Sequence, residues 1–540
     1  MYTKAKQRPI IWSIAGSDCS GGAGIQADIK TAHALNCEIC TLITANTVQN
    51  SKRLIKIHPT EIVVLQQQFE CLLEDKPPQV IKIGLIANNA QMQWLIETLT
   101  LLRRERAGLL VVFDPVSRAS VGADLVTETI STNQLNTLLK LVDVITPNTL
   151  EAEYLADVTE ADLSVKDWAE RILKRGCKAV LISDGHAVIN DDSADNHNND
   201  NVTDQCFYDN NHGRGVFRLR SPRIQTSFSH GSGCTLSTAL ASFLAHGYLL
   251  RDAFMQSKAF MNSAFQHSAL QQSLFEKVTD NSHATDYYGA LIQPSWPVDR
   301  RCYPQVVNQA GLAMQSGLRF PSLFQSSNTQ QLGLYPVVDS IEWLETLLPM
   351  NLEIIQLRIK NCPEPELSAQ IKQAVALAKN YPKTRLFIND YWQLAIEHGA
   401  YGVHLGQEDI QSADLNAIHH AGLRLGISTH GSYEFKLAEQ TQPSYLAIGA
   451  VFETQTKDMT GQIQGVDNLQ QLVNINGSIP LVAIGGITLE NMQRVIATGV
   501  NGVAVVTAVT LAENPKKVVK EFQRLLFNKS RQSNLKAKFS

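Results

Sequence analysis

Two glycine-rich turns in the first half of the sequence could let a ligand approach the backbone closely. The first turn, GSDCSGGAGIQAD, spans residues 16–28 and follows the apolar run Ile10–Ala15. The second turn, Gly231–Cys234 in HGSGC, comes directly before the helical pattern TLSTALASFLAHG. Consecutive backbone N–H groups at a helix N-terminus, together with the helix dipole, stabilise a phosphate or a phosphoryl group in transfer. The second turn is therefore a candidate anion hole.

Cys234 is the residue of this turn that can do acid–base chemistry. We expect the field of the anion hole to lower the pKa of its thiol. A buried structural cysteine at a tight turn is the alternative, and the glycines around Cys234 favour the reactive interpretation.

Three more polar side chains of the first half follow apolar runs. Asp114 lies at the end of the apolar run in VVFDPV. Asn148 and Glu151 lie in the segment ITPNTLEAE, just after another apolar run. Open α/β sheets bind ligands beyond the carboxyl ends of their strands. These three residues are therefore candidate ligand-binding residues.

Polar residues also recur after seven consecutive apolar runs of the second half. Gln356, Arg358 and Lys360 alternate along one run and so share a face. The other positions are Asn389 and Asp390, Gly406–Asp409, Ser428–His430, Thr454 with Thr456 and Lys457, Gly485 and Gly486, and Thr507. Basic side chains bind phosphate, paired aspartates hold a hard cation, and glycines expose N–H groups. The pattern predicts a site for a phosphorylated ligand and a divalent metal ion.

The elements that must position these residues are short β-branched runs alternating with longer mixed segments, which is typical of parallel sheets with crossover helices. In the first half we expect a doubly wound α/β sheet with helices such as Glu61–Leu73 and Leu163–Arg175. Its expected strands are Ile10–Ala15, Ile39–Thr44, Val80–Ile83, Leu109–Asp114, Val142–Thr146 and Ala179–Ser183.

In the second half, eight such runs predict a closed (βα)8 barrel of the TIM type, with an open sheet of six or seven strands as the competing arrangement. The expected strands are Leu332–Val338, Ile354–Leu357, Arg385–Ile388, Gly402–Leu405, Arg424–Ile427, Tyr445–Ile448, Leu481–Ile484 and Gly502–Val506.

Two stretches break the alternation. Residues 190–215 are dense in Asn, Asp and His, which predicts a solvated loop. Residues 276–330 carry scattered Pro, Gln, Ser and Asn with no clear strand, and Gln305–Ser316 is a candidate helix within them. We therefore expect domains at residues 1–285 and 331–530, joined by a linker at 286–330.

The overall composition, with 44% hydrophobic and 18% charged residues, is ordinary for a soluble globular enzyme. The net charge of −4 gives no electrostatic footprint for nucleic acid or an anionic membrane, and no apolar stretch is long enough to span a bilayer. Nine cysteines are few and odd in number, which favours a reducing cytoplasm over a disulfide scaffold. The pair Cys37 and Cys40 is expected to be buried.

The first-half motifs resemble the ribokinase-like superfamily, and within it the hydroxymethylpyrimidine/phosphomethylpyrimidine kinases of thiamine biosynthesis. The similarity covers about residues 10–270 and depends on AGSDCSGGAGIQADIK paired with HGSGCTLSTALA. It implies phosphorylation by ATP of 4-amino-5-hydroxymethyl-2-methylpyrimidine and then of its monophosphate. The implied roles are catalysis by Gly231, Ser232, Gly233 and the base Cys234; pyrimidine binding by Gly16, Asp28, Gln49, Leu85 and Val116; and nucleotide and Mg²⁺ binding by Asp114, Asn148 and Glu151.

The second-half motifs QLRIK, FIND, GVHLGQEDI, LGISTH, TQTKD and AIGGIT resemble thiamine phosphate synthase over about residues 332–527. The similarity implies that the pyrimidine diphosphate condenses with 4-methyl-5-(2-phosphoethyl)thiazole and releases pyrophosphate. The implied ligands are Gln356, Arg358, Lys360, Asn389, Ser428 and Lys457 for the pyrimidine diphosphate; Thr454, Thr456, Gly486, Val506 and Thr507 for the thiazole phosphate; and Asp390 and Asp409 for Mg²⁺.

The product implied for the first half is the substrate implied for the second half. The sequence therefore predicts a bifunctional enzyme of thiamine biosynthesis that acts on small molecules, uses Mg²⁺ and ATP, and is compatible with a homo-oligomer. Two alternatives remain: a pyridoxal-type vitamin kinase fused to a non-catalytic regulatory barrel, and a thiamine-responsive binding module without turnover.

Overall fold

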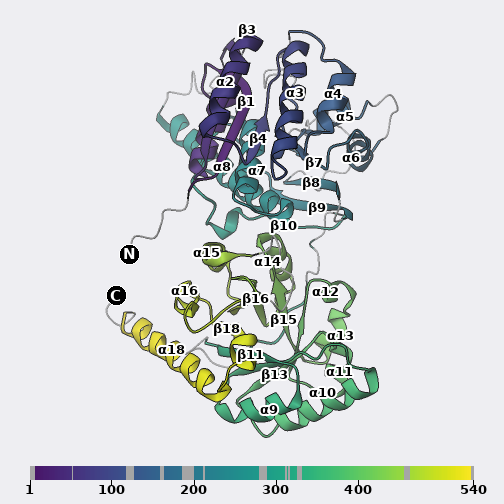
Figure 1. Ribbon diagram of the computed structural model, residues 1–540, viewed down its shortest axis with the longest axis vertical. Coiled ribbons are helices and arrows are strands. Elements are labelled where there is room, and N and C mark those ends of the chain that lie inside the picture. The colour runs from purple at the N-terminus through teal and green to yellow at the C-terminus, as the bar shows by residue number, and fades with distance from the viewer. Residues whose placement is uncertain are drawn as a thin grey trace. The chain divides into compact units, whose positions relative to one another are not determined.

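The computed structural model describes residues 7–50, 53–116, 127–157, 163–184, 200–210, 213–278, 289–310, 313, 317–324, 331–454 and 463–536. The chain divides into two compact units, Met1–Leu312 and Ala313–Ser540 (Figure 1).

The first unit is built on a ten-stranded sheet with the order β10-β9-β8-β7-β6-β5-β4-β1-β2-β3. Its strands are β1 (Ile10–Asp18), β2 (Glu38–Gln49), β3 (Leu54–Pro59), β4 (Val80–Ile83), β5 (Leu110–Phe113), β6 (Val144–Ile145), β7 (Ala179–Ile182), β8 (Asn201–Asn210), β9 (Gly213–Pro222) and β10 (Gln305–Val306). Strands β1, β2 and β4–β7 pair in parallel. Strands β3, β8, β9 and β10 pair antiparallel at the two edges.

Helices cover both faces of this sheet, as the alternation of side chains along β1 requires. Trp12 packs with residues of the helices on one face, and Ile11 packs with residues of α1 and α7 on the other. The helices are α1 (Gly24–Ala34), α2 (Ile62–Asp75), α3 (Asn89–Glu105), α4 (Thr132–Leu139), α5 (Thr149–Leu155), α6 (Val165–Lys174), α7 (Ser232–Ala245) and α8 (Leu250–Val278). The predicted doubly wound sheet and its six parallel strands are confirmed.

The loop expected over residues 190–215 is wrong for the part that the structure describes. Strands β8 and β9 pair from Asn201 opposite Pro222 to Asn210 opposite Gly213. Cys206, Phe207 and Leu219 supply the buried side of the hairpin, whereas most of its other residues are half-buried or exposed. A hairpin at the edge of a sheet tolerates this polar composition because one of its faces remains in water. Residues 190–199 and 211–212 lie outside the described residues.

The linker expected over residues 286–330 also differs from the structure. Gln305–Val306 is strand β10, which pairs with β9, so the candidate helix there is wrong. On the other side of Leu312, the Phe320 N–H donates to the Gln442 carbonyl within the second unit, at 3.0 Å. The structure therefore places the boundary between the units near residue 312, where we expected domain ends at 285 and 331.

The second unit is a closed barrel of eight parallel strands, which confirms the predicted (βα)8 architecture and excludes the open sheet (Figure 1). The strands are β11 (Gly333–Val338), β12 (Ile354–Leu357), β13 (Arg385–Asn389), β14 (Gly402–Leu405), β15 (Arg424–Thr429), β16 (Tyr445–Ile448), β17 (Leu481–Ala483) and β18 (Gly502–Val505). The helices are α9 (Ile341–Leu347), α10 (Glu364–Ala378), α11 (Trp392–Glu397), α12 (Asp409–Ser412), α13 (Leu415–His420), α14 (Ser432–Glu439), α15 (Gly465–Ile475), α16 (Met492–Ala497), α17 (Thr507–Thr510) and α18 (Pro515–Lys536).

Large aromatic side chains fill the barrel interior. Tyr335, Phe387 and Tyr445 are at most 2% exposed and pack in one cluster. Cys37 and Cys40 of the first unit are buried, as expected. Among the described residues, no helix combines the length and the apolar character needed to cross a membrane.

Candidate active sites

The two glycine-rich turns of the first unit lie directly against each other. Gly231 precedes α7 with φ +85°, and a Cβ at this position would lie 1.8 Å from the carbonyl oxygen of Gly22. A Cβ at Gly22 would in turn lie 2.2 Å from the imidazole of His230. Both positions therefore require glycine, and the anion turn Gly231–Cys234 is braced by the N-terminal turn.

Asp18 connects the two turns. One of its carboxylate oxygens lies 2.9 Å from Nε2 of His230 and also accepts the N–H groups of Gly22 and Ala23. Burial alone would raise the pKa of Asp18, but the hydrogen bonds from His230, Ser20 and Ala23 outweigh it and hold the pKa well below the usual range. An ionised Asp18 thus orders the loop that faces the anion turn.

Cys234 lies among charged groups, close to Lys82, Asp114 and Asp28 and within reach of the Gly24 N–H. Burial raises the pKa of its thiol to about 12, and the attraction of Lys82 offsets only part of that rise. The expectation of a lowered pKa is therefore wrong, because burial outweighs the attraction of Lys82 and the hydrogen bond with Gly24. At physiological pH the Cys234 thiol is therefore protonated and neutral.

A buried ion network lies beneath Cys234. Nζ of Lys82, on β4, is 3.0 Å from both carboxylate oxygens of Asp28 and 3.8 Å from Asp114. The carboxylate of Asp28 also accepts the hydroxyls of Ser13 at 2.6 Å and Thr238 at 2.7 Å. Lys82 and Asp28 are both fully buried. The structure places the carboxylate of Asp28 inside the unit, where it holds α1, β4 and α7 together. Its role in pyrimidine binding stays a prediction.

The other expected pyrimidine residues gather at the carboxyl ends of β1, β2 and the neighbouring strands. Gly16 packs on Leu85, since a Cβ at Gly16 would lie 2.7 Å from that side chain. Val116 packs against the same cluster as Leu85. Gln49 ends β2, and its carbonyl accepts a hydrogen bond from Sγ of Cys19 at 3.0 Å. Four of the five residues thus line the strand ends, and Asp28 does not.

Asp114, Asn148 and Glu151 form a second polar group at the strand ends. Asn148 caps α5: its Oδ1 accepts the Glu151 N–H at 2.9 Å, and its N–H donates to Glu151 Oε2 at 3.0 Å. Burial, with repulsion from Asp114, raises the pKa of Glu151 to about 8. Burial also raises the pKa of Asp114, against the attraction of Lys82. Carboxyl groups that repel each other in this way suit a divalent cation.

In the barrel, Asp390 and Asp409 come together from β13 and β14. Burial and the neighbouring Asp409 raise the pKa of Asp390 to about 6, whereas Arg358 and Lys360 oppose the rise. Two carboxyl oxygen donors beside two basic side chains fit a Mg²⁺ ion and a diphosphate. No cluster of three or more His, Cys, Asp or Glu side chains suited to a metal occurs in the described part of the chain.

Gln356 and Asn389 lie deeper at the same end of the barrel, 4% and 6% exposed. Nε2 of Gln356 is buried and finds no hydrogen-bond partner within the described residues. An unpaired buried donor costs free energy, and a ligand acceptor would recover it. Gln356 is thus well placed to recognise a polar ligand.

Ser428 is positioned by residues that the sequence motifs did not single out. Nε2 of His404 lies 2.8 Å from Ser428 Oγ, and Nδ1 of His404 lies 2.7 Å from Tyr445 Oη. The Tyr445 hydroxyl in turn lies 2.7 Å from the Tyr335 hydroxyl. Burial lowers the pKa of His404 to about 3, so this histidine is neutral and fixes the Ser428 hydroxyl. In the sequence, His404 stands within the motif GVHLGQEDI, but nothing in the motif indicated a role for it.

The expected thiazole phosphate residues are described only in part. A Cβ at Gly486, which has φ +62°, would lie 2.3 Å from the carbonyl oxygen of Glu453, the residue before Thr454. Val506 and Thr507 follow β18, which neighbours β17. Thr456 lies outside the described residues, as does Lys457, which was expected to bind the pyrimidine diphosphate.

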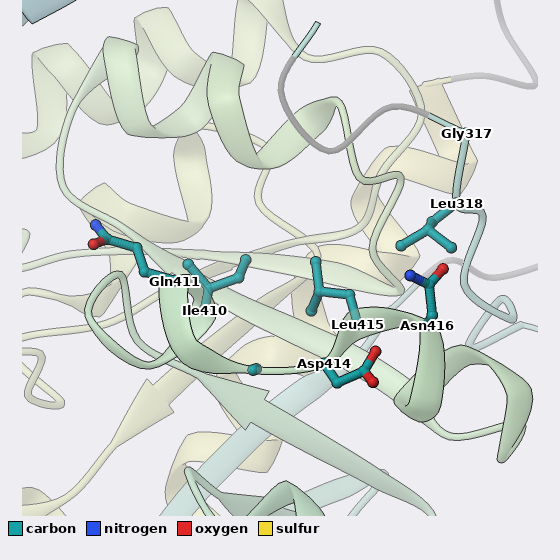
Figure 2. Close-up of a pocket in the computed structure, with 8 residues that line it drawn as sticks. Gly317, Leu318, Ile410, Gln411, Asp414, Leu415 and Asn416 are labelled. Atoms are coloured by element: carbon teal, nitrogen blue, oxygen red, sulfur yellow. The ribbon is translucent and has the colours of Figure 1, made fainter. Parts of the chain in front are cut away.

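A separate cavity of about 460 Å³ opens beside α12 and α13 (Figure 2). It is lined by Gly317, Leu318, Ile410, Gln411, Ala413, Asp414, Leu415 and Asn416. None of the expected ligand-binding residues lines it, so this cavity is distinct from the barrel site.

Comparisons with known proteins match each unit to a separate family. The phosphomethylpyrimidine kinase family matches residues 18–277, and the thiamine monophosphate synthase family matches residues 334–509. A thiamine-phosphate synthase of Yersinia pestis (strain Pestoides F) is 51% identical over 203 residues, which cover 38% of this chain and 94% of that protein. A solved phosphomethylpyrimidine kinase from Clostridium difficile 630 is 30% identical with a TM-score of 0.38, and the match covers 48% of this chain and 99% of that one. A Staphylococcus aureus pyridoxal kinase in complex with ADP is 27% identical with a TM-score of 0.41, covering 48% and 89%.

Proposed function

We infer the roles of individual residues from the identity of the chain. The chain belongs to the thiamine-phosphate synthase family and carries a unit of the phosphomethylpyrimidine kinase type ahead of the barrel. It is a bifunctional enzyme of thiamine biosynthesis. The first unit would use ATP to phosphorylate hydroxymethylpyrimidine and then its monophosphate. The barrel would join the resulting diphosphate to the thiazole phosphate.

In the kinase step, the N–H groups of the anion turn Gly231–Cys234 would stabilise the phosphoryl group during transfer. Because the raised pKa keeps the Cys234 thiol protonated, Cys234 can act as base only by passing on its own proton as it receives the proton of the hydroxymethyl group. Asp114 accepts a hydrogen bond from Cys234 and would take that proton. The close packing of Gly231 on Gly22 supports this site, because it fixes the donors before substrate binds.

In the synthase step, Arg358 and Lys360 would bind the diphosphate, and Asp390 and Asp409 would hold Mg²⁺. When bound, the ion neutralises charge on the departing pyrophosphate. Gln356 would donate its unpaired N–H to the substrate. The pyrimidine methylene, activated by the ring amino group, is then attacked by the thiazole nitrogen, and the protein needs no covalent nucleophile. The meeting of two carboxylates and two basic side chains at one barrel end is the observation that carries this assignment.

Two point variants separate the steps. Cys234→Ala should lower pyrimidine phosphorylation by about 10²–10⁴-fold, because it removes the proton-transfer group. Its synthase rate with supplied pyrimidine diphosphate should equal that of the wild type. Asp409→Asn should lower the synthase rate and leave pyrimidine phosphorylation at the wild-type rate.

Each variant is thus the control for the other, and both partial reactions are measured on the same preparation. Near-normal phosphorylation by Cys234→Ala would reduce this cysteine to a structural role. A synthase rate of Asp409→Asn that keeps its size and its Mg²⁺ dependence would contradict the metal assignment. Faster phosphorylation of pyridoxal than of hydroxymethylpyrimidine by the wild type would favour the vitamin-kinase alternative.

A further inference from the structure

The segment Gly289–Val307, here called the strap, lies between the two parts of the chain that match known families. The kinase family match ends at residue 277 and the synthase match begins at 334. The strap nevertheless belongs to the first unit, where β10 pairs with β9. Nothing in the family matches explains why this unit has it.

The strap contacts the anion turn on both sides. Before the turn, the His230 N–H donates to the Gly289 carbonyl at 3.3 Å, and the Leu291 N–H donates to the His230 carbonyl at 3.0 Å. After the turn, Nε2 of Gln293 donates to Oγ1 of Thr235 at 3.2 Å. His230 and Thr235 flank the catalytic residues Gly231–Cys234 directly, so the strap holds the two ends of the turn.

The close approach at the first contact depends on Gly289. A Cβ there would lie 2.6 Å from the ring of Phe228, two residues before His230. A larger residue would therefore push the strap away from the turn.

The strap is itself anchored to the body of the unit. Ser268 Oγ accepts the Ile292 N–H at 2.9 Å, and Asn262 Nδ2 donates to the Cys302 carbonyl at 2.8 Å, both from α8. The Tyr303 hydroxyl donates to Gln256 at 2.8 Å, and its side chain is 8% exposed. These contacts fix the strap as a rigid support.

A site that stabilises charge in a transition state gains most when its donors are held in place beforehand. We propose that the strap is a functional part of the kinase: it orients the anion turn by bracing His230 and Thr235, and Gln293 is a positioning residue for phosphoryl transfer. This inference rests on the proposed kinase function of the first unit.

A double-mutant cycle in the full-length chain tests this. Gln293→Ala and Thr235→Val each remove one side of the same hydrogen bond, and Thr235→Ser keeps the hydroxyl. We measure kcat and KM for hydroxymethylpyrimidine phosphorylation, with the synthase rate of the same sample as the internal control. Val298→Ala is the matched control, because Val298 lies in the strap but is 54% exposed.

We expect Gln293→Ala and Thr235→Val to lower the kinase kcat by about fivefold each, as the loss of one hydrogen bond implies. The double variant should lose no more than either single variant, because both remove the same contact. KM, the synthase rate and the Thr235→Ser and Val298→Ala variants should stay within about twofold of the wild type.

An unchanged kcat for Gln293→Ala, or losses that multiply in the double variant, would overturn the inference. A parallel loss of synthase activity would do the same, since it would mean that Gln293 serves general stability. If the wild type fails to phosphorylate hydroxymethylpyrimidine at all, the proposed function fails instead, and the two failures are thereby distinguished.

Discussion

Burial controls the ionisation of Cys234 and Asp390, one candidate site residue in each unit. The pKa of the Cys234 thiol rises to about 12 although the residue begins a helix, and the pKa of Asp390 rises to about 6 although two basic side chains are close. In each case the removal of water outweighs the favourable charges. Both groups are therefore expected to change their ionisation when a charged ligand binds beside them.

The raised pKa of Asp390 predicts a pH dependence of metal binding in the synthase. A carboxyl group with a pKa of about 6 is protonated below that pH, and its protonated form binds a cation poorly. The apparent affinity of the synthase for Mg²⁺ should thus fall as the pH is lowered from 7.5 to 5.5. Rates measured over a Mg²⁺ titration at each pH test this, and an affinity that does not change over this range would contradict it.

Lys82 should be essential for the first unit, because it is fully buried between two carboxylates. Lys82→Met leaves Asp28 and Asp114 without their cation and should destabilise the unit by about 3–5 kcal/mol. Kinase activity should be lost while synthase activity remains. The double variant Lys82→Met with Asp28→Asn removes one uncompensated charge and should recover part of the stability in urea unfolding. No difference between the single and double variants would show that the charge balance is unimportant.

Among the elements, the anion turn has the tightest backbone requirement. Gly231→Ala places a Cβ 1.8 Å from a backbone carbonyl at a φ of +85°, so the turn must move away from the N-terminal loop. We expect kinase activity to fall by at least about tenfold, which corresponds to about 1.4 kcal/mol in the transition state.

The matched control for this variant is Gly108→Ala. A Cβ at Gly108 meets nothing within 4 Å, and this residue has no role in either site. Its kinase rate should equal that of the wild type. If Gly231→Ala is as active as Gly108→Ala, the turn is not the rigid anion hole described above.

The regular elements could be predicted from the sequence because each has a strong local signal. All eight barrel strands are apolar runs bounded by turn residues, and the polar side chains that follow them come together at one end of the barrel. The hairpin β8–β9 could not be predicted in this way. Only a few of its side chains, such as Phe207 and Leu219, are buried, and most of its other residues are half-buried or exposed.

Within the kinase site, contacts between distant segments determine what the sequence could not predict. Asp28 has the residue type of a ligand-binding group, yet Lys82, 54 residues away, pairs with it inside the unit. The burial that raises the pKa of Cys234 also depends on segments far apart in the chain. The strap has too little periodicity to suggest a strand, and its contacts with His230 and Thr235 appear only in the folded unit.

The whole chain should separate into two active fragments at the observed boundary. A fragment of residues 1–312 keeps the strap and should phosphorylate hydroxymethylpyrimidine, whereas a fragment of residues 1–285 lacks the strap and should be far less active. A fragment of residues 313–540 should condense supplied diphosphate with thiazole phosphate. Equal kinase rates for the two N-terminal fragments would place the boundary at 285 after all.

The most direct test of the bifunctional assignment is a single reaction with the full-length chain. Hydroxymethylpyrimidine, ATP, Mg²⁺ and the thiazole phosphate are incubated with the enzyme, and thiamine phosphate is measured over time. Our account predicts that thiamine phosphate accumulates, that two molecules of ATP are consumed for each one formed, and that omitting ATP stops the reaction unless pyrimidine diphosphate is supplied. If the chain forms no thiamine phosphate from the complete mixture, or none from supplied diphosphate, the account is contradicted.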